Sequence, residues 1–206
     1  MTPDYQATRL APPPRHLPTM TRLVILFGGA INQMGWFFMM VGLPMVLIFG
    51  FMGGAMIPGA LLAGIFPIIG GLFAFFSMRR NWKAILLLHQ GQTARGKLVD
   101  KQATNTKIND QTVYEYSFAF KTPDGQKHIA KGKTHHTHLL EDEETEFLLY
   151  MADDPDNAMM YDAIPHAPRI LPSGEFEALS IFRYWTLIVP GIVMLVLAFT
   201  LFSLLN

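Results

Sequence analysis

Four histidines form the one group of side chains in this sequence with the character of metal ligands: His128, His135, His136 and His138. Alternate residues of a strand share a face, so His136 and His138 would lie together if they were on a strand. His128 would approach them from a neighbouring strand. Three neutral imidazoles can hold zinc. A polar loop with solvated histidines explains the same residues without a metal. We expect the loop and no cofactor, and keep zinc as the alternative.

Other signatures of catalysis are missing from the sequence. The acidic run from Glu141 to Glu144 lacks the alternating oxygen ligands and central glycine of a calcium loop, which favours a solvated turn. There is no cysteine and therefore no thiolate chemistry. There is also no serine-hydrolase elbow, zinc-protease helix motif, Walker loop or dinucleotide glycine fingerprint. We expect no catalytic residues and a protein that is not an enzyme.

Charged residues are absent from two long parts of the chain. Asp, Glu, Lys and Arg make up 16% of the 206 residues, yet none occurs from Leu23 to Met78 or from Tyr184 to Asn206. Roughly 20 apolar residues suffice for a helix that crosses the ~30 Å hydrocarbon core of a bilayer. The pattern predicts an integral, multi-pass membrane protein of membrane α + β architecture, with three transmembrane helices in contact with the lipid bilayer.

The first uncharged part is too long for one simple span. A break near Gly28–Gly29 and Asn32–Gln33 would divide it into an interfacial segment at about 21–32 and a span at about 33–53. A single long tilted helix is the alternative. Asn32 and Gln33 would face water if the first segment is interfacial, or would mark a helix–helix hydrogen bond or a substrate path.

Three further segments complete the predicted membrane architecture. A second span at about 58–78 follows a short turn, which makes residues 21–83 an antiparallel membrane hairpin. The third transmembrane helix covers 181–206. Residues 1–20 are polar and rich in proline, and we expect them to be disordered.

Small residues recur along one side of the second predicted span. At 100° per residue they fall within about 50° of one line: Ala60, Ala63, Gly64, Pro67, Gly71 and Ala74. Small side chains let helices approach closely in lipid. We expect a helix-packing face toward the first span, the third span or a second copy, although Gly and Ala are also common in membrane helices without this role.

Basic and aromatic residues flank the predicted spans. Arg79 and Arg80 follow the second span, and Arg183, Tyr184 and Trp185 open the third, as is typical of interfacial anchors. Cytoplasmic flanks carry the excess of Lys and Arg. We therefore expect a cytosolic N-terminus and a cytosolic domain between the second and third spans, with the C-terminus outside, in a bacterial inner (plasma) membrane.

Residues 84–180 change to a period of two, with aromatic residues alternating along 113–120 and turn residues from Thr122 to Gly125. We expect strands at 93–99, 113–120, 126–132, 145–151 and 158–164. They predict a soluble antiparallel barrel or sandwich, SH3-like or OB-like, with its linker. The region holds nine basic and fifteen acidic residues, a balance that disfavours nucleic acid and anionic lipid headgroups.

The order of these segments resembles the DUF3592 family, membrane proteins built around a domain of unknown function. The resemblance covers roughly residues 22–205 and is carried by short structural motifs: Leu26-Phe27-Gly28-Gly29, Gly35-Trp36, Ala94-Arg95-Gly96-Lys97-Leu98, Tyr114-Glu115-Tyr116-Ser117-Phe118 with Asp124-Gly125, and the run from Leu149 to Asn157. Where the family often has a glycine before the Tyr150 strand, this chain has Glu143-Glu144-Thr145. The resemblance implies a fold and a topology and brings no catalytic residues.

These features favour a non-enzymatic interaction, assembly or accessory subunit that acts through its β domain and the small-residue face. Its partners would be further copies of itself or other membrane-protein subunits, and not nucleic acid. One alternative is a histidine-dependent metal-binding membrane enzyme or sensor. Another is a transport accessory or small channel lined by Asn32 and Gln33.

Overall fold

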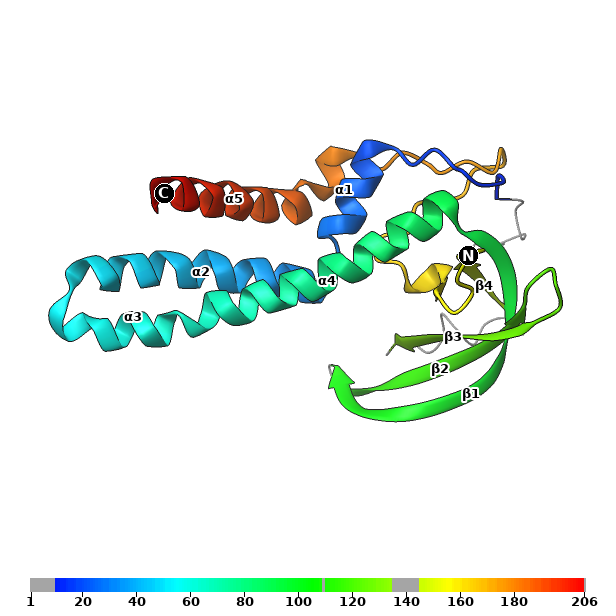
Figure 1. Ribbon diagram of the computed structural model, residues 1–206, viewed down its shortest axis with the longest axis horizontal. Coiled ribbons are helices and arrows are strands. Elements are labelled where there is room, and N and C mark those ends of the chain that lie inside the picture. Colours follow the sequence, from blue (N-terminus) through cyan, green and yellow to red (C-terminus); the bar gives the residue numbers. More distant parts are fainter. Residues whose placement is uncertain (1–9, 109, 135–144, 206) are drawn as a thin grey trace. The chain divides into compact units, whose positions relative to one another are not determined.

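The computed structural model describes residues 10–108, 110–134 and 145–205 (Figure 1). Contacts within the chain divide it into two compact units. We call Thr19–Trp82 with Leu179–Asn206 the helical unit, and Met1–Pro18 with Lys83–Ala178 the β unit. Each unit therefore combines segments that are distant in the sequence.

The helical unit begins with a short helix and a glycine break. Helix α1 ends at Phe27 and helix α2 begins at Ala30, where the glycine pair predicted a break in place of one long helix. Gly29 has a φ of 92°, a backbone conformation that favours glycine. The helices are α1 (Thr19–Phe27), α2 (Ala30–Met52), the 3₁₀ helix η1 (Gly54–Met56), α3 (Ile57–Ala63), α4 (Ile65–Gln90), whose last turns belong to the β unit, and α5 (Ile181–Leu205).

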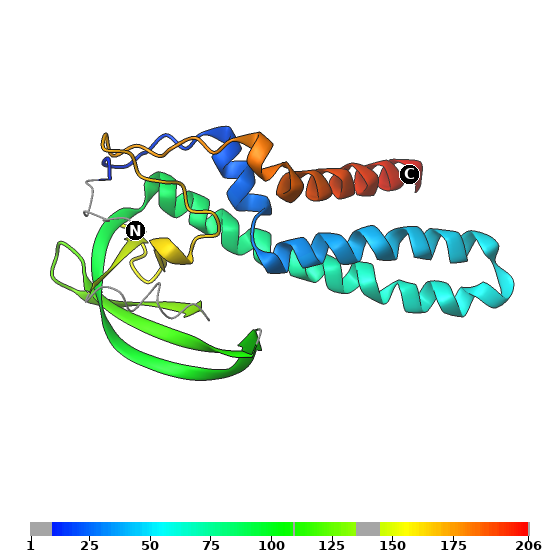
Figure 2. The ribbon, with the colours of Figure 1, turned by 180° about the vertical axis from the view of Figure 1, so that it is seen from behind.

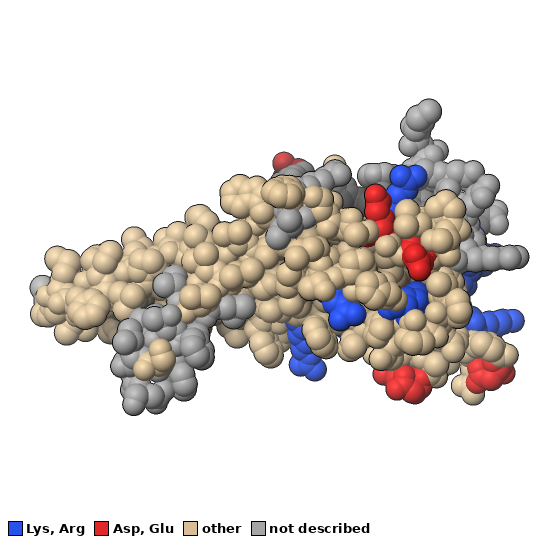
Figure 3. Space-filling model, turned by 90° about the horizontal axis from the view of Figure 1, so that it is seen from above, with Lys and Arg blue, Asp and Glu red and all other residues tan. Residues whose placement is uncertain are grey.

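Two helical stretches in the described part of the chain are long and apolar enough to cross a membrane: Ala30–Met52 and Ile57–Gln90. They form the two arms of a hairpin and lie side by side in both ribbon views (Figures 1 and 2). Large apolar side chains point outward along it, for example Phe51 (88% exposed) and Leu61 (73% exposed). From Ala30 to Met78 the hairpin has no Lys, Arg, Asp or Glu, and the left part of Figure 3 shows no blue or red atoms.

The β unit contains a five-stranded antiparallel sheet with the order β3-β2-β1-β4-β5. The strands are β1 (Gln92–Ile108), β2 (Gln111–Lys121), β3 (Lys127–Thr134), β4 (Thr145–Tyr150) and β5 (Ala158–Met160), and the 3₁₀ helix η3 (Tyr161–Ala163) follows. The sheet is nearly closed, because Met160 of β5 occupies the space beside Gly132 of β3. A small antiparallel β domain is thus confirmed, and β1 extends nine residues beyond the predicted strand end at Val99.

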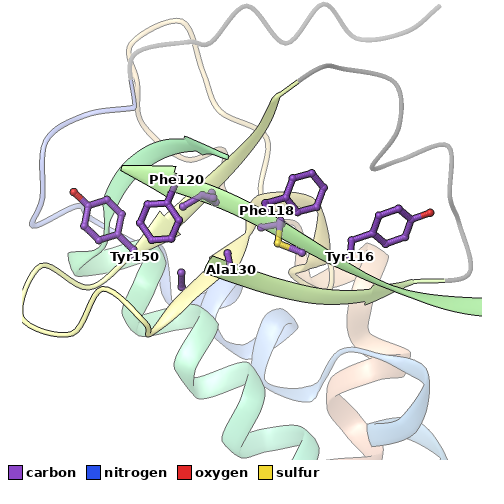
Figure 4. Packing of buried hydrophobic residues seen from close by; sticks show 8 residues of the cluster. Tyr116, Phe118, Phe120, Ala130 and Tyr150 are labelled. Carbon is purple, nitrogen blue, oxygen red and sulfur yellow. The ribbon is translucent and has the colours of Figure 1, made fainter. Parts of the chain in front are cut away.

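Alternation along β2 creates the core of the β unit. Tyr116, Phe118 and Phe120 point to the same side and are buried, and Tyr150 of β4 and Ala130 of β3 join them (Figure 4). The β2–β3 turn is the predicted one. Gly125, with a φ of 84°, donates a backbone hydrogen bond of 2.8 Å to the Thr122 carbonyl.

The N-terminal segment differs from its prediction. Residues 10–18 were expected to be disordered, but they pack within the β unit, and residues 19–20 open α1. Leu17 is buried, and the Arg15 amide donates to the His89 carbonyl at 2.8 Å. A proline-rich composition disfavours helix and strand, but a proline-rich segment in an extended conformation can still pack its side chains against a folded domain.

Candidate functional site

Three amide side chains gather around the break between α1 and α2. Asn32 Nδ2 donates to the Leu26 carbonyl at 2.9 Å, and Gln33 Nε2 donates to the Phe27 carbonyl at 2.7 Å. From α4, Asn81 Nδ2 reaches the same turn. The last carbonyls of a helix have no hydrogen-bond partner inside the helix. In an apolar medium each unpaired carbonyl destabilises the fold by roughly several kcal/mol. The amides supply the missing donors.

The same amides connect α1, α2, α4 and α5. Asn81 Nδ2 lies 3.1 Å from both the Leu26 and the Gly28 carbonyl, and Gln33 Nε2 lies 2.9 Å from the Leu187 carbonyl of α5. The prediction that Asn32 faces water is wrong, because its side chain is fully buried. Amides are neutral at any physiological pH and transfer no protons, so this cluster can hold helices together but cannot perform acid–base chemistry.

The predicted small-residue face packs against α2. Ala63 and Ala74 are buried, and the other four are half-buried, whereas Leu61, Leu62 and Leu72 on the other sides of the helix are exposed. Pro67 contacts the backbone of Gly42, which leaves no room for a side chain there. Within the described structure the face is therefore occupied by this chain's own helix.

The predicted face includes Gly71, but the glycine that packs closely against α2 is the adjacent Gly70. Gly35 of α2 and Gly70 approach each other closely, since an added Cβ on Gly70 would lie 2.6 Å from the Gly35 carbonyl oxygen. An added Cβ on Gly71, which the spacing predicted to pack, would have nothing within 4 Å. The 100° periodicity identified the face of the helix but not the residue at its centre, because the crossing angle of two helices selects one residue among neighbours.

The residues predicted as interfacial anchors occupy two helices. Arg79 and Arg80 are exposed on α4, which continues through them to Gln90. At the start of α5, Tyr184 packs against the apolar cluster of the helical unit and Trp185 is 56% exposed. Arg183 lies in the same helix, and its side chain is outside the described structure. These positions allow the predicted anchoring without testing it.

Only one of the four candidate metal ligands lies in the described structure. His128 Nδ1 lies 2.9 Å from Asp156 Oδ1, and its ring packs against Phe120. The described residues contain no group of three His, Cys, Asp or Glu placed to hold a metal. His135, His136 and His138 lie outside them, so the zinc hypothesis stays a prediction.

A buried arginine caps the end of α4. Arg15 Nη1 donates to the Gly91 carbonyl at 2.8 Å and to the Leu88 carbonyl at 3.2 Å. A cation at the C-terminus of a helix is favoured by the helix dipole. Burial lowers the pKa of Arg15 to about 10, so it remains charged at neutral pH.

Sequence reasoning missed Arg15 and Asn81. Gly91 after a long helical pattern is a recognisable C-cap signal and could have prompted a search for a basic residue. Nothing in the sequence pairs that helix end with a residue more than seventy positions away, because the pairing is set by tertiary packing. Asn81 was not recognised as a candidate, because it lies just beyond the predicted span at about 58–78.

Strands β1, β2 and β3 have an inner face that is largely apolar and an outer face that is largely polar. Direct cross-strand partners share a face, and the outer pairs include Lys97 with Ala119, Ser117 with Lys131, and Lys121 with Lys127. Basic residues therefore collect on the outer face.

Comparisons of the chain with protein-family models, curated proteins and solved structures found no match.

Proposed function

We propose that this protein is a multi-pass integral membrane protein that serves as a non-enzymatic interaction or assembly subunit. The observation that carries the proposal is the outward-facing apolar surface of the α2–α4 hairpin. Soluble monomers rarely expose contiguous apolar patches larger than about 600 Å². After Gln33, α2 is apolar on every side, with Phe37, Phe51 and Ile48 all more than half exposed. Lipid would cover such a surface.

Helix α5 is proposed as a third span. It has 25 residues and carries no charge after Arg183, and a length of about 20 apolar residues suffices to cross a bilayer. With an odd number of spans and with basic residues in α1, in the second half of α4 and at the start of α5, the N-terminus and the β unit would lie in the cytosol and the C-terminus outside.

The β unit is the part proposed to meet partners. Its inner face is filled by its own aromatic core, and the small-residue face of the hairpin is covered by α2. The surfaces that remain for association in the described structure are the outer face of the sheet and the lipid-facing sides of the helices. Tethering to the membrane at both ends would raise the local concentration of the β unit and favour weak contacts.

Crosslinking in native membranes tests the proposal. An amine-reactive reagent reaches the exposed lysines of β1 and β3, so a tagged chain should appear in a defined species larger than the monomer. Recovery of monomer alone over a full range of reagent, in membranes where a known oligomer is crosslinked, would contradict an assembly role.

A further inference from the structure

The outer face of strands β1, β2 and β3 is basic although the region that contains it is acidic overall. Register places on this face six cations and two acids. The cations, which we call the basic face, are Arg95 and Lys97 of β1, Lys121 of β2, and Lys127, Lys131 and Lys133 of β3. The acids are Asp100 and Glu115.

Charges on the basic face are only partly compensated. Glu115 lies 3.0 Å from Lys133 and 3.9 Å from Lys131. By contrast Lys121 and Lys127 are direct cross-strand partners and are not ion-paired with any residue that the structure describes. Like charges placed opposite each other destabilise a sheet. An acidic partner at this end of the face would relieve the repulsion.

An apolar residue lies among these cations. Ile129 is 52% exposed and is paired across the strands with Ala119, which is paired in turn with Lys97. A central apolar side chain within a charged rim is the ordinary composition of a protein–protein contact.

Three acidic residues lie in the turn between β4 and β5. Asp153, Asp154 and Asp156 are exposed, and we call them the acidic turn. The backbone N–H of Asn157 donates a hydrogen bond of 2.9 Å to the Asp154 backbone carbonyl and so closes the turn. The contact between Asp156 and His128 places this turn beside β3, the strand that carries Lys127. The β unit therefore presents a basic patch and an acidic patch near one another.

We propose that the basic face of one copy docks on the acidic turn of a second copy in a two-fold contact. In a two-fold interface the basic face of each copy meets the acidic turn of the other copy, so the same contact is made twice. This inference rests on the proposed membrane assembly, because surface ion pairs are individually weak and confinement of two copies to one bilayer raises their effective concentration. The contact should weaken at high salt.

A charge swap between two tagged copies tests the docking. The chain has no cysteine, so Gln126→Cys beside Lys127 in one copy and Ala152→Cys beside the acidic turn in the other give one disulfide between copies. Reversal in both copies by Lys121→Glu with Lys127→Glu should reduce the disulfide yield about tenfold. Adding Asp153→Lys with Asp154→Lys to both copies should restore it.

A matched control changes the net charge equally outside the basic face. Lys107→Glu with Arg169→Glu should leave the yield unchanged, since Lys107 is paired with Thr112 on the opposite face of the β1–β2 hairpin. The docking is overturned if both reversals act equally. It is also overturned if the swap fails to restore the yield, which would point to an acidic lipid or another protein on this face. If amine crosslinking still recovers an oligomer in those cases, the proposed assembly stands and only this contact falls.

Discussion

At the scale of single residues, the helical unit depends on amide side chains that replace missing helix donors. Asn81 serves two carbonyls, those of Leu26 and Gly28. The Leu26 carbonyl also accepts from Asn32, so Asn81 matters most for the Gly28 carbonyl, and a buried carbonyl that loses its donor costs on the order of 1–3 kcal/mol. The break at Gly28–Gly29 is therefore stabilised from α4 as well as by Asn32 and Gln33 at the start of α2.

We expect Asn81→Ala to lower the free energy of unfolding by about 1 kcal/mol or more, because both carbonyls lose a donor. Unfolding of the purified protein in detergent, followed by tryptophan fluorescence, measures the change. Asn105→Ala, in an exposed part of β1, provides the matched control. Equal stability of the two variants would remove the structural role assigned to the amide.

Glu115 gives a prediction for acid conditions. The hydrogen bond from Lys133, followed by the charge of that lysine, holds the pKa of Glu115 below its ordinary value of 4.5. Because the pKa of Glu115 is lower in the folded state than in the unfolded state, the ion pair stabilises the protein fully above the unfolded pKa. This stabilisation is lost as the pH falls through the folded pKa. Glu115→Gln should flatten a small part of the decline in melting temperature below about pH 5. Parallel declines in both proteins would contradict this.

At the scale of elements, two adjacent glycines in α4 separate packing from helix propensity. We expect Gly70→Ala to destabilise the hairpin by about 1–3 kcal/mol, because its Cβ would meet the Gly35 carbonyl at 2.6 Å. Gly71→Ala meets nothing within 4 Å and should be neutral or stabilising by up to about 1 kcal/mol through helix propensity. Thermal unfolding in detergent distinguishes the two, and the reverse order would refute the described helix contact.

The cap on α4 gives a second prediction at this scale. Arg15→Met keeps much of the side-chain volume but removes the Nη1 group that donates to both the Leu88 and the Gly91 carbonyl. We expect a loss of about 1–3 kcal/mol in the stability of the β unit. Arg169→Met, in an exposed loop, is the control. A loss no greater than that of the control, measured by denaturant unfolding, would show that the N-terminal segment does not stabilise this helix end.

The elements were more predictable than their contacts. Alternating aromatic residues and the Thr122–Gly125 turn predicted the β2–β3 hairpin, because period and turn chemistry are local. The glycine pair likewise predicted the end of α1. Arg15, Asn81 and Gly70 could not be assigned from the sequence, since each acts on a helix whose distance and crossing angle are properties of tertiary packing.

At the scale of the whole molecule, topology can be measured with single cysteines in a chain that has none. Met52→Cys at the end of α2 and Asn105→Cys in the β unit are both exposed. The proposed topology predicts that an impermeant thiol reagent applied to intact cells labels Met52→Cys and not Asn105→Cys, and that both react after lysis. Labelling of both in intact cells would contradict a cytosolic β unit.

Membrane insertion of the hairpin is the claim on which the rest depends. Alkaline carbonate removes proteins held by surface charge but not helices in hydrocarbon, because apolar burial does not depend on pH. After carbonate treatment and ultracentrifugation of membranes, we expect the full-length chain in the pellet, released only by detergent. A chain recovered in the carbonate supernatant would contradict membrane insertion.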